Sequence, residues 1–115
     1  MGESSKSGAL TETTFYILLS LYTPNHGYGI MQFVEKETAG RVVMGPGTLY
    51  GAINLLLKKE WIEPFDSSDK GRKKDYIITN AGKDAVNREI ERLEKLYTFA
   101  CKIVGEEDND EEKGI

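Results

Sequence analysis

The chain is organised around Met44-Gly45-Pro46-Gly47-Thr48-Leu49-Tyr50-Gly51-Ala52-Ile53-Asn54, a stretch that predicts the start of a helix. Pro46 suits a first helical turn, because its missing N–H removes no needed hydrogen bond there. Apolar residues recur at helical spacing at Leu49, Ile53 and Leu56, which predicts a buried face. The opposite face is small and polar: Gly47, Gly51, Asn54 and Lys58, flanked by Thr48 and Tyr50. A helix with two such faces can bury its leucines and let a negatively charged, grooved partner come close.

A basic cluster follows this helix, between two segments typical of strands. Residues 61–65 and 73–79 predict a hairpin, and Pro64 places the first strand at a sheet edge because proline lacks a ladder donor. The cations of the tip are Lys70, Arg72, Lys73 and Lys74. Four cations so close together favour contact with phosphates over a merely solvated turn. A helix followed by a basic hairpin is typical of a winged helix that holds DNA.

Three further helices complete the predicted fold. Thr11 can cap a first helix that runs to about residue 22 and is apolar nearly all round, so more than one side of it must be buried. A second helix fits residues 27–38, with Gly40 as a left-handed cap, and residues 41–44 predict a short strand. Thr79 or Asn80 can cap a last helix that ends near residue 104.

The net charge of −4 is unevenly distributed along the chain. Residues 105–115 carry −5, which leaves the rest near +1, and their lack of apolar periodicity predicts a disordered acidic tail. A single cysteine allows no disulfide framework within the chain, and no apolar run predicts a membrane span or a signal peptide, so we expect a cytoplasmic protein. No catalytic or metal-binding spacing is present, so neither an enzyme nor a cofactor is expected.

The last helix carries an apolar seam with alternating steps of four and three residues. Its members are Val86, Ile90, Leu93, Tyr97, Ala100 and Val104, with Leu96 widening it. One interpretation is a helix that packs on its own domain. The other, which we favour, is a symmetric dimer in which the seam and the first helix, including Phe15, cover one another.

Several motifs together resemble the PadR family of bacterial transcriptional regulators, in its short form with a single C-terminal dimerisation helix. The matching segments are Leu10-Thr11, Phe15-Tyr16-Ile17-Leu18-Leu19, His26-Gly27-Tyr28-Gly29-Ile30, Gly45-Pro46-Gly47-Thr48-Leu49-Tyr50 and Gly71-Arg72-Lys73, with Tyr76 and Thr79. The resemblance spans about residues 10–104. It implies a winged helix-turn-helix, a homodimer, and repression of nearby genes that a small molecule often relieves.

This chain also departs from the family pattern. Trp61 stands where the family more often has glycine, Asp75 puts a negative charge beside the basic cluster, and Ile77 replaces a cation. Asp75 and Ile77 lie in the outer wing and not in the helix. An alternative function, an interaction module or antirepressor that has lost DNA binding, stays open.

The predicted fold class is α+β, mostly α: a winged helix-turn-helix with a long C-terminal dimerisation helix. We expect a flexible lead at 1–9, a DNA-binding domain at 10–79, the dimerisation helix at 80–104 and the acidic tail at 105–115. The expected function is a repressor that binds an inverted-repeat operator in double-stranded DNA as a homodimer. Residues that could bind a small aromatic or hydrophobic effector are Phe15, Tyr16, Leu93 and Tyr97. We interpret these four rather as parts of a dry dimer core.

Overall fold

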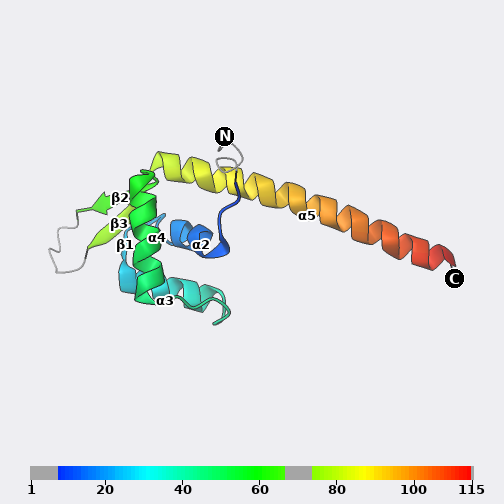
Figure 1. The fold of residues 1–115 in the computed structure, drawn as a ribbon, viewed down its shortest axis with the longest axis horizontal. Helices are drawn as coiled ribbons and strands as arrows, with labels where there is room; N and C mark the ends of the chain where they lie inside the picture. Colours follow the sequence, from blue (N-terminus) through cyan, green and yellow to red (C-terminus); the bar gives the residue numbers. More distant parts are fainter. Residues whose placement is uncertain (1–7, 67–73, 115) are drawn as a thin grey trace.

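The computed structural model describes residues 8–66 and 74–114 and shows a mostly helical chain with a small antiparallel sheet (Figure 1). The elements are α2 (Glu12–Ser20), β1 (Asn25–His26), α3 (Gly27–Glu37), α4 (Pro46–Lys58), β2 (Ile62–Phe65), β3 (Asp75–Ile78) and α5 (Asn80–Gly114). In Figure 1 the sheet and the projecting end of α5 lie on opposite sides of α4. This is the predicted winged helix-turn-helix fold with a long C-terminal helix.

The predicted buried face of α4 is confirmed. Leu49, Ile53 and Leu56 are at most 1% exposed and pack into the hydrophobic core of the domain. The core is shared by all the helices and by two strands: Ile17, Leu18, Leu21, Ile30, Val34, Met44, Leu49, Ile53, Leu56, Ile62, Tyr76, Ile78 and Val86. Because α2 contributes fully buried and half-buried residues to this core, it is covered on more than one side, as its all-round apolar character predicts.

The sheet has the strand order β1-β3-β2, with both pairs antiparallel. Pro64 lies in β2, an edge strand, opposite Tyr76 of β3. Its missing N–H therefore removes no hydrogen bond from the centre of the sheet. Sequence patterning does not predict β1, which is only two residues long and pairs with the first residues of β3. The turn between β2 and β3, residues 67–73, lies outside the described residues.

The segment Arg41–Met44, predicted as a strand, is irregular. It forms the end of the connection between α3 and α4, and no strand of the described sheet pairs with it. Thr38 holds this connection: its hydroxyl donates to the Val34 carbonyl at 2.8 Å, and its oxygen accepts from the Val42 N–H at 3.0 Å. Because these side-chain bonds satisfy the backbone locally, the extended segment needs no partner strand.

Three residues in the described part have a left-handed backbone: Ala39 (φ 53°), Gly40 (φ 81°) and Glu60 (φ 64°). Gly40 ends α3 as predicted, although Ala39 shares the left-handed turn. Glu60 follows Lys59, the C-cap residue of α4. Its left-handed backbone is a conformation that favours glycine.

The last helix starts on the domain and then leaves it. The predicted cap is confirmed at Thr79, whose side-chain oxygen accepts from the Gly82 N–H at 3.0 Å. Ala85, Val86 and Glu89 are buried against the domain, whereas every residue at 93–104 is exposed. The molecule therefore measures 67 × 36 × 22 Å, with a radius of gyration of 18.3 Å, against about 13 Å for a compact chain of similar length.

Two expectations for this helix are corrected. Val86, predicted in the dimer seam, is 2% exposed and belongs to the core of its own domain, because the first turns of α5 pack on α2 and β3. The helix also continues to Gly114. The predicted helix end at residue 104 is therefore wrong, and residues 105–114 have a helical backbone where a disordered tail was predicted. No proline interrupts residues 105–114, and glutamate is a good helix former.

Candidate nucleic-acid interface

The exposed face of α4 carries the predicted reading residues. Gly47, Thr48, Gly51, Asn54 and Lys58 are all exposed, opposite the buried apolar face. A Cβ atom added at Gly47 or at Gly51 would meet nothing within 4 Å, so these positions lie in open space. The helix contains no acidic residue between Pro46 and Lys58. A polyanion can therefore approach the backbone of α4 without repulsion from a carboxylate on this helix.

Tyr50 stands at the edge of this face and joins α4 to α3. Its side chain is 45% exposed, and its hydroxyl end lies so close to Gly27 that a side chain at Gly27 would overlap it. Burial, with a smaller contribution from Tyr50, raises the pKa of the Tyr76 hydroxyl in β3. Tyr50 is thus partly a packing residue and partly a surface residue.

Sequence reasoning missed Tyr28, which is 64% exposed in the first turn of α3. It follows Gly27, the residue that lies against Tyr50. The signal that could have revealed it is the pair of glycines on either side of Tyr28, which leaves the ring without a side chain on its sequence neighbours.

The two helices at this face begin without a side-chain cap. The residues at their N-cap positions, His26 for α3 and Gly45 for α4, make no capping hydrogen bond, whereas Thr11 caps α2 and Thr79 caps α5. Free backbone N–H groups and the helix dipole make such an N-terminus suited to a phosphate oxygen. Thr48 lies in the first turn of α4, next to this N-terminus.

The basic wing is described only in part. Lys74 is exposed beside the start of β3, whereas Lys70, Arg72 and Lys73 lie outside the described residues. Asp75 and Ile77, the two departures in the returning strand, are half-buried and pair with Phe65 and Glu63 of β2. The two strands of the wing are therefore antiparallel, as the predicted hairpin requires.

The projecting half of α5 exposes an apolar stripe, which we define as Ile90, Leu93, Leu96, Tyr97, Ala100, Ile103 and Val104. Its large members are 38–71% exposed, and Phe99, at the stripe's edge, is 61% exposed. At helical spacing this stripe continues the face that buries Ala85, Val86 and Glu89 in the domain. The predicted dimerisation residues are thus all unburied in the single chain, apart from Val86 and the half-buried Phe15.

The predicted effector residues divide into two environments. Phe15 and Tyr16 of α2 are half-buried and pack against the core of their own domain. Leu93 and Tyr97 are exposed on α5. The four residues thus differ in burial within one chain.

The wing, the free face of α4 and the projecting α5 define a winged helix-turn-helix regulator of transcription. The profile of the transcriptional regulator PadR-like family matches residues 16–88. The chain belongs to this family. No helix in the parts of the chain at 8–66 and 74–114 is both long and apolar enough to cross a membrane.

Two known proteins are similar to this chain in sequence. It is 36% identical over 73 residues to an uncharacterized 37.1 kDa protein of transposon TN4556 from Streptomyces fradiae, covering 64% of this chain and 20% of that protein. It is 39% identical over 67 residues to uncharacterized protein X of Lysinibacillus sphaericus, covering 56% and 62%. The chain thus spans less than two thirds of either relative.

Solved structures share the fold. A transcriptional regulator from Clostridium thermocellum, Cth-833, aligns with a TM-score of 0.64 at 22% identity, over 83% of this chain and 90% of that chain. RosR of H. salinarum aligns with a TM-score of 0.59 at 26% identity, over 84% and 94%. A PadR-like transcription factor from Bacteroides fragilis aligns with a TM-score of 0.63 at 22% identity, over 87% and 94%.

Proposed function

We propose that this protein is a DNA-binding transcriptional repressor that reads an inverted-repeat operator as a homodimer. The observation that carries the proposal is the exposed face of α4, which combines two open glycines, an exposed amide at Asn54 and no carboxylate of this helix. Because Gly47 and Gly51 have no side chains, α4 can approach the floor of the major groove. Asn54 can then pair with an adenine edge, while Thr48 and Tyr50 lie near the sugar-phosphate backbone.

The cations near α4 and the wing are suited to contact DNA phosphates, which would position the protein on the duplex. Lys58 ends α4 on the exposed face, and Lys74 is exposed at the wing. The predicted contacts of Lys70, Arg72 and Lys73 with phosphates belong to the same proposal. Such contacts add affinity for any sequence and make it salt-dependent, whereas Asn54 adds discrimination between sequences.

The apolar stripe of α5 supports the dimer. Exposed apolar surfaces of this extent mark interaction sites, and the stripe continues the face that this domain buries in the first turns of α5. A second copy offers the same stripe and the half-buried Phe15 of α2, and a two-fold axis lets each copy cover the other. Two recognition helices about 34–36 Å apart, or a multiple of that distance, then match the two half-sites of the operator.

The test combines self-association with DNA binding. Replacing Leu93 and Tyr97 together by glutamate puts like charges into the proposed interface, so we expect loss of the dimer in sedimentation and of operator binding in a titration. The control is Thr98→Glu, which adds one negative charge on α5 away from the stripe and should leave both unchanged. A double variant that sediments as a compact dimer would show that another surface joins the copies. If the wild-type protein is a dimer but binds no double-stranded DNA even at low salt, the alternative function is favoured: an interaction module or antirepressor that has lost DNA binding.

A further inference from the structure

Two aliphatic side chains are exposed on the unit formed by α4 and the residues just before it. Val43 is 66% exposed and lies two residues before Gly45, the N-cap of α4, and Leu55 is 51% exposed in the second half of the helix. Within the described chain, neither belongs to the hydrophobic core or to the half-buried residues packed against it. The fold itself therefore does not account for their apolar character.

Val43 stands between two anchored residues. The Val42 N–H donates to the Thr38 hydroxyl oxygen at 3.0 Å, and Met44 is 7% exposed in the core. The connection before α4 is irregular, but its backbone is thus held on both sides of Val43. The exposed side chain is presented next to the N-terminus of α4, the end of a recognition helix that contacts base edges in helix-turn-helix proteins.

Leu55 stands beside the open space over Gly51. Side chains four and seven residues apart lie on the same side of a helix, so Leu55 shares its side of α4 with Gly51 and Thr48. A Cβ atom added at Gly51 would meet nothing within 4 Å. A small group of a partner that fills this space is therefore in reach of the Leu55 side chain.

The chemistry of the major groove limits what these two side chains can recognise. The base edges there carry hydrogen-bond donors and acceptors, and their one apolar group is the C5-methyl of thymine. An aliphatic side chain makes no hydrogen bond to the polar groups, whereas contact with a methyl group removes apolar surface of both partners from water. Thymine is therefore the base that Val43 and Leu55 are suited to distinguish.

We propose that Val43 and Leu55 recognise the C5-methyl groups of two thymines in each operator half-site. The inference rests on the proposed function, because it requires α4 in the major groove. Leu55 covers the methyl group that fills the space over Gly51, and Val43 contacts a thymine near the N-terminus of α4. The two thymines lie within about five base pairs of each other, because α4 rises about 15 Å from Gly45 to Leu55 and base pairs stack about 3.4 Å apart.

The test replaces thymine by uracil, which lacks only the methyl group. An operator is selected from random duplexes with the full-length wild-type protein, and each thymine is then changed to uracil in both half-sites together. Binding is measured by fluorescence anisotropy at one salt concentration. We expect two of the thymine positions to weaken binding at least fourfold, about the ratio for one buried methyl group, and the others to change it less than twofold.

The variants Leu55→Ala and Val43→Ala assign each methyl group to its side chain. Each variant should bind the thymine operator at least fourfold more weakly, lose the uracil penalty at one position and keep it at the other. Leu55→Met and Val43→Ile retain an apolar side chain and should keep both penalties. A merely structural role would not shift the penalty at a single base, and circular dichroism should be unchanged in all four variants.

The possible failures are distinguishable. If the wild type binds no duplex in preference to a scrambled one, the proposed function falls and this inference falls with it. If specific binding is present but the half-sites lack thymine, or no uracil substitution weakens binding twofold, the inference alone is overturned. It is overturned equally if either alanine variant keeps both penalties.

Discussion

Replacing Gly51 by leucine should strengthen the fold and remove specific DNA binding at the same time. Gly51 lies in the interior of α4, is exposed, and would place a Cβ atom within 4 Å of nothing in the described chain. The new side chain therefore meets no protein atom that has to move. It points into the space that the proposal assigns to the major groove.

The two effects have different magnitudes. A glycine inside a helix costs about 0.5–1 kcal/mol relative to a good helix former, so the variant should be more stable by roughly that amount. Specific binding, by contrast, depends on close approach of α4. Keeping α4 away from the groove should reduce affinity for the operator to that for a scrambled duplex, a loss of about 10³-fold or more.

The assay is a fluorescence-anisotropy titration on an operator selected with the wild-type protein and on a scrambled duplex, with thermal unfolding followed by circular dichroism. Gly105→Leu is the matched control, because Gly105 is helical and open but lies far along α5 from the DNA face. It should leave DNA binding unchanged. If Gly51→Leu folds, dimerises and binds the operator as tightly as the wild type, α4 is not the reading helix. A lower unfolding temperature would show that this face is packed.

Three further outcomes follow from other parts of the molecule. Glu60→Gly should raise the free energy of unfolding by about 1 kcal/mol in a denaturant titration, because the left-handed backbone at φ 64° disfavours any residue with a Cβ atom; a lower midpoint would contradict this. Hydrogen bonds from the Arg92 guanidinium lower the pKa of Glu89 below its ordinary 4.5, so the stabilisation by its ionised form is complete above about pH 4.5 and is lost as the pH falls through the folded-state pKa. Glu89→Gln should thus be less stable at neutral pH and depend less on pH below 4.5 in thermal melts, and an unchanged pH profile would refute the role of the carboxylate. Lys74→Ala should lower the salt-dependence slope of DNA binding by about one per protomer, and an equal slope would leave Lys74 in solvent.

Much of the α4 region could be predicted from the sequence, because its determinants are local. The proline at the helix start predicts where the helix begins. The spacing of Leu49, Ile53 and Leu56 predicts which side of it is buried. The exposed face of α4 is then the side opposite these buried residues. Pro64 likewise indicates an edge strand, since the missing donor is a property of the residue itself.

Strand pairing could not be predicted in the same way. Residues 41–44 have strand-like side chains but remain irregular, whereas Asn25–His26 pairs with β3 without any strand-like pattern. A strand exists only where a partner backbone lies beside it, and the packing of α2 and α3 decides where that is. Val86 shows the same limit for a helix, because apolar periodicity marks a buried side without saying which surface covers it.

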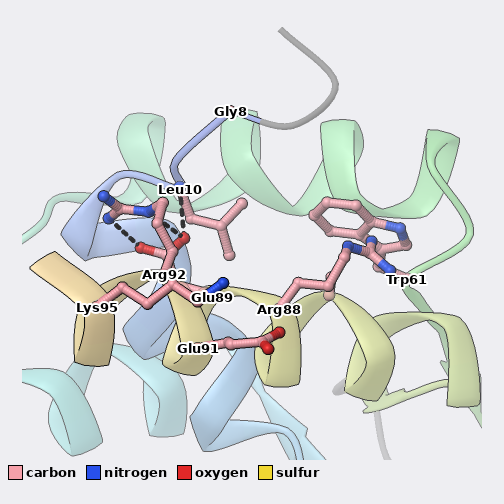
Figure 2. A pocket seen from close by; sticks show the side chains of 9 residues that line it. Gly8, Leu10, Trp61, Arg88, Glu89, Glu91, Arg92 and Lys95 are labelled. Atoms are coloured by element: carbon pink, nitrogen blue, oxygen red, sulfur yellow. Dashed lines mark hydrogen bonds and ion pairs between the residues drawn. The ribbon is translucent and has the colours of Figure 1, made fainter. Parts of the chain in front are cut away.

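A cavity lies where α5 leaves the winged domain, and its wall depends most on the tertiary structure (Figure 2). One hydrogen bond of this wall joins the Leu10 N–H to the Glu89 carboxylate, two groups that are 79 residues apart in sequence. In the sequence, Leu10 is the first residue of the predicted domain and Glu89 is one of several charges on a long helix, and neither indicates the other as its partner. Folding brings them together with Trp61, and the burial of one carboxylate then requires the partners that shape the wall, because an unpaired charge is costly away from water.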